Sequence, residues 1–217
     1  MIEGAIFDMD GLMFDSERVW GTLWQPALAA FGLTVPEGLP DAARGTTGDA
    51  ALAVIRRFCG PDVNPEAIFA EFYHQADLVF AKGVPPKPGL FELLDYFGEH
   101  GIPMAVASSS SEPLIRNNLE RAGIAGRFAT VVPGKEVVHS KPAPDIFLEA
   151  ARRLGVNPSR ALVLEDSFPG VRAGAAGGFV TVMVPDTMAP TDEIRALATR
   201  VCASLTEVRA LLEAGEL

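Results

Sequence analysis

The sequence predicts an α/β fold in which a mainly parallel sheet carries an inserted, all-helical segment. Three observations support this: short apolar runs recur along the 217 residues, amphipathic helical patterns separate most of them, and one long stretch has helical periodicity only. Runs of four to six apolar residues between turn signals are typical of buried strands. The expected strands are residues 4–7, 102–107, 128–132, 161–164 and 180–184.

Helical patterns follow four of these runs or lead into them. In residues 88–100, for example, Leu90, Leu93, Leu94 and Phe97 share one apolar face. Strands that alternate with helices of this length indicate crossover connections and therefore a parallel sheet. The other expected helices of the sheet domain are residues 111–122, 145–154 and 169–176.

The stretch between the first and second expected strands breaks this alternation. Its helical patterns are separated by Gly and Pro residues, and a proline-rich segment, residues 84–89, leads back to the sheet. We therefore expect a core domain of residues 1–15 and 88–217 and a helical cap domain of residues 16–87. The expected cap helices are residues 17–31, 47–58 and 65–80.

Composition narrows the classes of partner. Hydrophobic residues make up 48% and charged residues 21% of the chain, which is ordinary for a soluble globular protein. The formal net charge of -10 disfavours nucleic acid and anionic membranes as partners. Two cysteines, the lack of a signal peptide and the lack of a long apolar stretch predict a cytoplasmic protein, which we expect to be a monomer.

Polar side chains follow four of the expected strands. Because ligands of open α/β sheets bind beyond the carboxyl ends of the strands, these side chains are expected to meet at one edge. In chain order they are Asp8 and Asp10, the serine run from Ser108, Lys141 in the loop after the third strand, and Glu165 with Asp166.

This set of side chains predicts phosphoryl transfer. A carboxylate at a rigid strand end, here Asp8, can attack phosphorus and form an acyl phosphate. Asp8 and Asp166 would hold Mg²⁺, which prefers carboxylate oxygens together with substrate phosphate. Gly11 indicates a turn that brings Asp10 back, so Asp10 can protonate the leaving oxygen, activate water and offer its main-chain carbonyl to the metal.

The remaining groups would bind the phosphate. Lys141 supplies a positive charge for Asp8 and the transferring group. Ser108 offers a hydroxyl, and the amides of Ser109 and Ser110 are expected to open a helix, where anions are favoured.

Four segments resemble the motifs of the haloacid dehalogenase superfamily of phosphatases. They are FDMDGLMFDSE at Phe7–Glu17, ASSSS at Ala107–Ser111, SKPAPDIF at Ser140–Phe147 and LEDSFPGVRAG at Leu164–Gly174. The resemblance runs along the whole chain and implies a Rossmann-like parallel sheet core with an inserted helical cap. It also implies the roles given above, and a role for Glu165 in assisting the metal through water.

Within that superfamily the chain is similar to the group of β-phosphoglucomutase and 2-deoxyglucose-6-phosphate phosphatase. Trp20 stands where the mutase has a His, and Gly48 where it has an Arg, so we expect hydrolysis of a small phosphorylated metabolite, with a sugar phosphate as first choice. The alternative is a phosphosugar mutase. A receiver-type signalling module phosphorylated on Asp is disfavoured by Asp10 and by the helical insertion.

Three cap residues are candidates for contact with the substrate. Trp20 and Trp24 lie four residues apart on one helix face, where they either line the substrate side of the cap or form its core. Arg44 lies in an expected loop, where it either contacts the far end of the substrate or is solvated.

Overall fold

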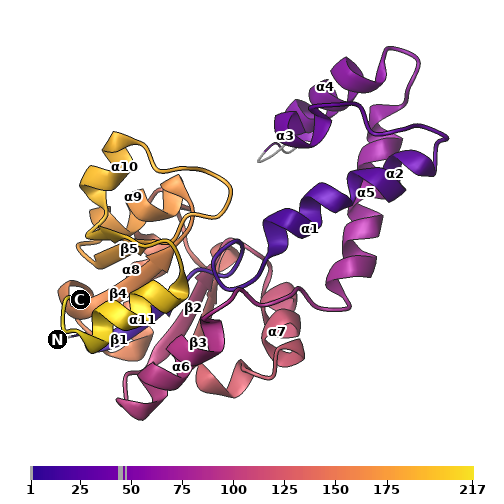
Figure 1. Ribbon diagram of the computed structural model, residues 1–217. Helices are drawn as coiled ribbons and strands as arrows, with labels where there is room; N and C mark the ends of the chain where they lie inside the picture. The colour runs from indigo at the N-terminus through magenta and orange to yellow at the C-terminus, as the bar shows by residue number, and fades with distance from the viewer. Residues whose placement is uncertain (1, 44–45, 47) are drawn as a thin grey trace. The chain divides into compact units, whose positions relative to one another are not determined.

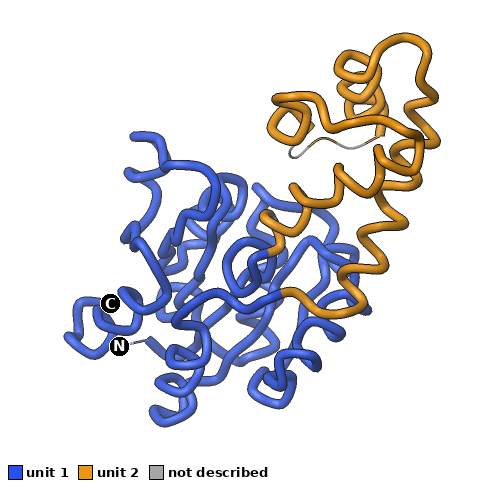
Figure 2. Tube along the Cα trace, turned by 45° about the vertical axis from the view of Figure 1, so that its right-hand side comes forward, with its two compact units in different colours: residues 1–15, 85–217 blue, residues 16–84 orange. Residues whose placement is uncertain are grey.

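The computed structural model describes residues 2–43, 46 and 48–217. Packing divides the chain into two compact units, a core unit with the residues up to Asp15 and from Pro85 onward, and a cap unit of Ser16–Val84 (Figure 2). The expected cap, 16–87, extends slightly further. Main-chain hydrogen bonds from Asp15 N to Pro85 O (2.9 Å) and from Lys87 N to Met13 O (2.8 Å) attach residues 85–87 to the core unit.

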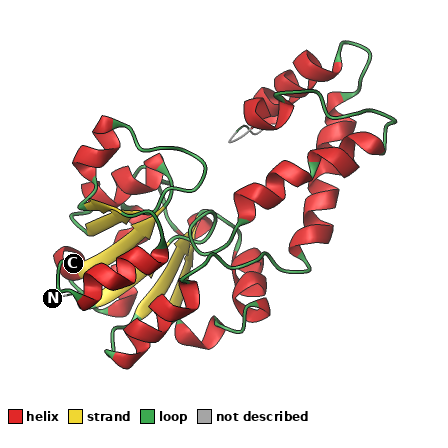
Figure 3. Ribbon diagram, viewed as in Figure 1, coloured by secondary structure: helices red, strands yellow, loops and turns green. Residues whose placement is uncertain are grey.

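The core unit contains a six-stranded sheet in which every neighbouring pair is parallel (Figure 3). The strand order is β3-β2-β1-β4-β5-β6, which confirms the expected Rossmann-like sheet. The short strand β6 was not expected, because two residues carry no recognisable pattern. The strands are β1 Gly4–Phe7, β2 Met104–Ser108, β3 Thr130–Pro133, β4 Ala161–Glu165, β5 Val180–Met183 and β6 Arg200–Val201.

Helices cover both faces of this sheet (Figure 1). Successive residues of a strand point to opposite faces, so Ile6 packs with α8 and α9, whereas the Phe7 ring meets Phe97 of α6 edge to face at 5.9 Å. The core helices are α6 Leu90–Glu99, α7 Glu112–Arg121, α8 Asp145–Leu154, α9 Phe168–Ala176, α10 Asp192–Leu197 and α11 Leu205–Glu213, with 3₁₀ turns η1 Ala125–Arg127, η2 Gly134–Glu136 and η3 Pro158–Arg160.

The described residues of the cap unit form helices and connections without a strand (Figure 3). Its centre is aromatic: the ring of Phe72 stacks on Trp20 at 5.7 Å and packs against Trp24 at 4.3 Å. The helices are α1 Ser16–Thr22, α2 Trp24–Ala29, α3 Leu39–Ala43, α4 Gly48–Cys59 and α5 Pro65–Phe80.

The first cap helix is interrupted, unlike the single helix that we expected over residues 17–31. Pro26 has no N–H to donate to the carbonyl of Thr22, and its ring disfavours a continuous helix before it. Helix α1 accordingly ends at Thr22, and helix α2 begins at Trp24. The five-residue α3 was also not expected, since it is too short to show helical periodicity.

None of the described helices has the length and apolar character that a bilayer span requires.

Candidate active site

The candidate site lies at the carboxyl ends of β1 and β4, the two central strands where the strand order reverses. The register pairs Phe7 with Leu164, and the amide of Asp8 donates to the carbonyl of Leu164 at 3.0 Å. The next residues, Asp8 directly after β1 and Glu165 at the end of β4, therefore leave the sheet side by side.

Lys141 connects these two strand ends. Its Nζ donates to Oδ1 of Asp8 at 2.5 Å, to Oε1 of Glu165 at 2.6 Å and to the carbonyl of Ala107 at 3.3 Å. These acceptors match the three N–H donors of an ammonium group. The amine also lies 4.8 Å from the ring centre of Phe147. The side chains of Lys141, Asp8 and Glu165 are 7%, 9% and 0% exposed, so both ion pairs are buried.

Both carboxylate oxygens of Glu165 accept hydrogen bonds. Its Oε2 accepts from the amides of Asp166 (3.0 Å) and Ser167 (2.9 Å) and from the Ser167 hydroxyl (2.9 Å), while Oε1 receives Lys141. Its carboxylate also lies directly over Gly170, where an added Cβ would be 1.8 Å from Oε1. Both oxygens of Glu165 are thus engaged by the protein, and the residue orients Lys141.

Asp166 completes a group of three acids. One carboxylate oxygen from each of Asp8, Glu165 and Asp166 lies within 4.8 Å of the others. Gly11, in the turn after β1 with φ of 79°, makes room for this arrangement: a Cβ there would lie 2.1 Å from Oδ2 of Asp166. The absence of a side chain at Gly11 therefore sets how close Asp166 can come to the nucleophile loop.

The electrostatics of the group show an excess of negative charge. Burial raises the pKa of Asp8 from 3.8 to about 8 although Lys141 opposes the shift, and Glu165 and Asp10 add to it. Burial together with the charges of Glu165, Asp8 and Asp186 raises the pKa of Asp166 to about 9. Burial lowers the pKa of Lys141, but Asp8 and Glu165 outweigh it and raise that pKa above its usual range.

This donor set fits a hard divalent cation such as Mg²⁺. The candidate ligands are carboxylate oxygens, and the raised pKa values show that protons would otherwise have to neutralise Asp8 and Asp166. Because Lys141 and the Ser167 region already hold Glu165, Asp8 and Asp166 are the first candidates for direct ligands. The expected help of Glu165 to the metal through water stays a prediction. The carboxylate of Asp10 lies outside the group of three, and its main-chain carbonyl as a ligand stays a prediction.

Asp10 instead faces the serines after β2. The hydroxyl of Ser110 donates to Oδ2 of Asp10 at 2.7 Å, and that of Ser108 lies 3.4 Å from the same oxygen. The Ser110 amide donates to Oγ of Ser108 at 3.1 Å. Helix α7 begins only at Glu112, with Ser111 as its N-cap, so our expectation that the amides of Ser109 and Ser110 open this helix is wrong. Both serines lie in the preceding loop.

Two charged residues near the site, Lys87 and Asp186, were not identified from the sequence. Lys87 forms ion pairs with Asp186, which follows β5, and with Asp15 at 3.6 Å. Oδ2 of Asp186 is buried and has no hydrogen-bond partner among the described residues. The expected strand at residues 180–184 was the available signal. Ligands bind beyond the carboxyl ends of such strands, and Asp186 follows this one just as the other candidate residues follow theirs.

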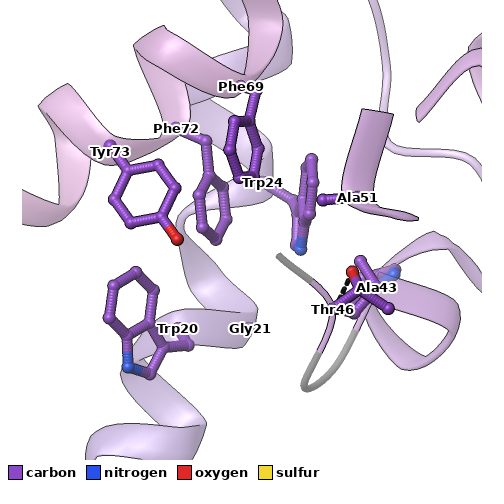
Figure 4. A pocket seen from close by; sticks show the side chains of 10 residues that line it. Trp20, Gly21, Trp24, Ala43, Thr46, Ala51, Phe69, Phe72 and Tyr73 are labelled. Carbon is purple, nitrogen blue, oxygen red and sulfur yellow. Dashed lines mark hydrogen bonds between the residues drawn. The ribbon is translucent and has the colours of Figure 1, made fainter. Parts of the chain in front are cut away.

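The cap unit has a pocket of its own, about 220 Å³ in volume. Aromatic side chains from α1, α2 and α5 gather around it (Figure 4), and none of the ten described residues that line it is charged. Trp20 and Trp24 both line this pocket and also pack on Phe72, so both belong to the aromatic centre of the cap. Their contact with the substrate stays a prediction. Arg44, the third cap candidate, lies outside the described residues.

Comparison with known proteins agrees with this geometry. Residues 2–178 match the family described as haloacid dehalogenase-like hydrolase. The chain therefore belongs to the haloacid dehalogenase-like hydrolases, and within them to the phosphatases, which hydrolyse phosphoric monoesters. The resemblance found in the four motifs is thus confirmed.

Several relatives share most of the chain's length. A fructose-1-phosphate phosphatase of Escherichia coli is 32% identical over 181 residues, covering 83% of this chain and 95% of the relative. Hexitol phosphatase B of the same species is 29% identical over 217 residues, covering 96% and 95%. A bifunctional riboflavin kinase/FMN phosphatase of Arabidopsis thaliana is 32% identical over 208 residues, and the match covers 94% of this chain but only 54% of that protein.

A solved structure carries the same fold. It is a haloacid dehalogenase family hydrolase from Deinococcus radiodurans with bound phosphate and sodium, 29% identical in sequence. The match covers 100% of this chain and 97% of that one, with a TM-score of 0.83.

Stability should depend on pH in a way that Mg²⁺ changes. Between pH 3.8 and about 9, native Asp166 keeps a proton that the unfolded chain has released, so the metal-free protein loses stability as pH rises through this range. A Mg²⁺ concentration a hundredfold above the Kd at pH 5 should add about 2.7 kcal/mol, and the same concentration should add more at higher pH, where no proton competes for the site and the Kd is lower. Melting temperatures from pH 5 to 8, in EDTA and in Mg²⁺, measure the difference. A Mg²⁺ effect independent of pH would contradict the assignment.

Gly11→Ala should weaken metal binding by about tenfold or more, because the new Cβ pushes Asp166 away from Asp8. Gly123→Ala is the matched control: its φ is 70° and no atom lies within 4 Å of the added Cβ. Both variants should lose roughly 1–2 kcal/mol of stability from backbone strain, whereas only the first should lose Mg²⁺ affinity in calorimetric titration. Equal affinities would show that Asp166 does not depend on Gly11.

Proposed function

We propose that the protein is a Mg²⁺-dependent phosphatase that releases phosphate from a small phosphorylated metabolite, in the first place a sugar phosphate, through an aspartyl-phosphate on Asp8. One observation carries this proposal: a buried ammonium, Lys141, bridges Asp8 and Glu165 while Asp166 lies beside them. At one edge of the sheet the arrangement thus supplies a nucleophile, Asp8, and a fixed positive charge, Lys141. Asp8 also offers a carboxylate oxygen to a cation, together with Asp166.

The first half of the reaction transfers the phosphoryl group. A carboxylate oxygen of Asp8 attacks phosphorus, and the bond from phosphorus to the ester oxygen of the substrate breaks. The carboxyl group of Asp10 gives its proton to this departing oxygen, so an alcohol leaves instead of an alkoxide. Asp8 then carries the phosphoryl group as a mixed anhydride, and Asp10 is a carboxylate.

The second half restores the enzyme. Asp10 accepts a proton from a water molecule, whose oxygen attacks the phosphorus of the aspartyl-phosphate. The bond between this phosphorus and the Asp8 oxygen breaks, inorganic phosphate departs, and Asp10 is again protonated.

Charge compensation makes both halves feasible. Bound Mg²⁺ would neutralise the carboxylates of Asp8 and Asp166 and screen the phosphate charge from them. Lys141, already fixed by Glu165, supplies a positive charge that needs no rearrangement as negative charge develops on the transferring group. Ser108 and Ser109, at the end of β2, remain candidates for contact with the phosphate oxygens.

Two lines support a sugar phosphate as substrate. The relatives include a fructose-1-phosphate phosphatase and a hexitol phosphatase. The cap pocket, moreover, offers aromatic faces without a charged described side chain, a surface suited to the apolar faces of a neutral organic group. We propose Trp20 and Trp24 as the residues that contact it. Trp20 and Gly48, in place of the His and Arg of the mutase, favour release of phosphate over its return to the sugar.

Asp8→Asn should reduce Mg²⁺-dependent phosphate release to background, because an amide nitrogen or oxygen is too weak a nucleophile to replace the carboxylate. Released phosphate, measured with an aryl phosphate as substrate, provides the readout. Asp8→Ala, which cannot revert by deamidation, should give the same result, and circular dichroism should show both variants folded. Turnover well above background in the alanine variant would exclude an aspartyl-phosphate on Asp8.

Trp20→Ala should lower kcat/KM for the preferred sugar phosphate by about two- to tenfold, the range expected from the loss of one aromatic contact. Acetyl phosphate, which has no ring or polyol, serves as the control substrate and should be affected much less. A panel of sugar, hexitol and nucleoside phosphates identifies the preferred substrate first. Equal losses on both substrates would indicate damage to the cap and not a lost substrate contact.

A further inference from the structure

We propose that the hydroxyl of Ser110 is a positioning group that decides which oxygen of Asp10 transfers the proton. This role of Ser110 rests on the proposed function of Asp10 as general acid and base. Ser110 lies in the loop between β2 and α7, two residues beyond Ser108.

The contact between these side chains is short and specific. Oγ of Ser110 donates to Oδ2 of Asp10 at 2.7 Å, a normal length for a hydroxyl bonded to a carboxylate. Ser108 is the poorer partner, because its Oγ lies 3.4 Å from the same oxygen. Its Oγ also accepts a hydrogen bond from the Ser110 amide at 3.1 Å. Ser110 therefore makes the principal hydrogen bond to the Asp10 carboxylate.

The bond also links two strand ends. Asp10 follows β1 and Ser110 follows β2, which are hydrogen-bonded neighbours in the sheet. The hydrogen bond from the Ser110 amide to the Ser108 hydroxyl holds this loop against the end of β2, because Ser108 is the last residue of that buried strand. Asp10 is thus anchored to the rigid sheet through a second strand and not only through its own turn, as precise proton transfer requires.

A hydroxyl suits both protonation states of the acid. When Asp10 is a carboxylate, Ser110 donates to Oδ2. When Asp10 is protonated, Ser110 can still donate to Oδ2 as a carbonyl oxygen, which leaves the proton on Oδ1. The hydrogen bonds described for both serines reach Oδ2 and not Oδ1. The same oxygen, Oδ1, would therefore give its proton to the leaving group and take one from water.

Leaving-group dependence separates this role from a structural one. An alkyl phosphate needs its leaving oxygen protonated, whereas p-nitrophenol leaves as a stabilised anion and does not. The value of kcat/KM reports steps up to phosphoryl transfer to Asp8, and the hydrolysis of the aspartyl-phosphate that follows is shared by both substrates. A residue that positions the acid should therefore affect kcat/KM of the alkyl phosphate selectively.

Ser110→Ala should lower kcat/KM for a sugar phosphate by about tenfold or more, part of the 10²–10⁴ that general acids contribute, and change kcat/KM for p-nitrophenyl phosphate less than about twofold. With the aryl substrate, slower hydrolysis of the aspartyl-phosphate should appear as a burst of nitrophenol. Ser111→Ala is the matched control, because the Ser111 side chain makes no capping hydrogen bond. It should leave both values unchanged.

A double-mutant cycle with Asp10→Asn closes the test. In that background, Ser110→Ala should cause no further loss on the sugar phosphate. Equal losses on both substrates, an unchanged Ser110→Ala variant, or additive losses in the cycle would overturn the positioning role. If Asp10→Asn itself shows no selective loss on the sugar phosphate, the proposed acid and base role of Asp10 fails instead, and the inference about Ser110 fails with it.

Discussion

Lys141 places a positive charge, almost entirely out of water, between the carboxylates of Asp8 and Glu165. Burying an ion is costly unless partners surround it, and here all three ammonium donors are used. The compensation is incomplete, because Asp166 adds a third acid within the same small volume. Burial is the main cause of the raised pKa values of Asp8 and Asp166, and the neighbouring carboxylates add to it. A cation at these two acids would favour their charged forms.

The sheet topology and two glycines make this arrangement possible. Parallel pairing of β1 with β4 brings Asp8 and Glu165 out of the sheet at one level, at the point where the strand order reverses. Gly170 lets the Glu165 carboxylate lie against the helix that follows it, and Gly11 leaves room for Asp166. The positions of the acids thus follow from backbone geometry, and Glu165, with both oxygens engaged, serves the site by orienting Lys141.

Much of this arrangement is predictable from the sequence, because strand ends in a parallel sheet meet at one edge. That reasoning brought together Asp8, Asp166 and Lys141 without coordinates. It could not find the pairing of Ser110 with Asp10 or of Lys87 with Asp186, since each depends on the path of a loop that has no periodic pattern. It also missed the break before Trp24, although Pro26 was the available signal, and short elements such as α3 and β6.

Anomalous diffraction from crystals grown with Mn²⁺, a substitute for Mg²⁺ with a usable absorption edge, tests the central charge argument most directly. The account predicts one dominant peak at about 2.1 Å from a carboxylate oxygen of Asp8 and one of Asp166, with Lys141 still hydrogen-bonded to Glu165. It also predicts loss of that peak in Asp166→Ala crystals. A cation bound elsewhere, or no cation at saturating Mn²⁺, would contradict the assignment of these two acids as metal ligands.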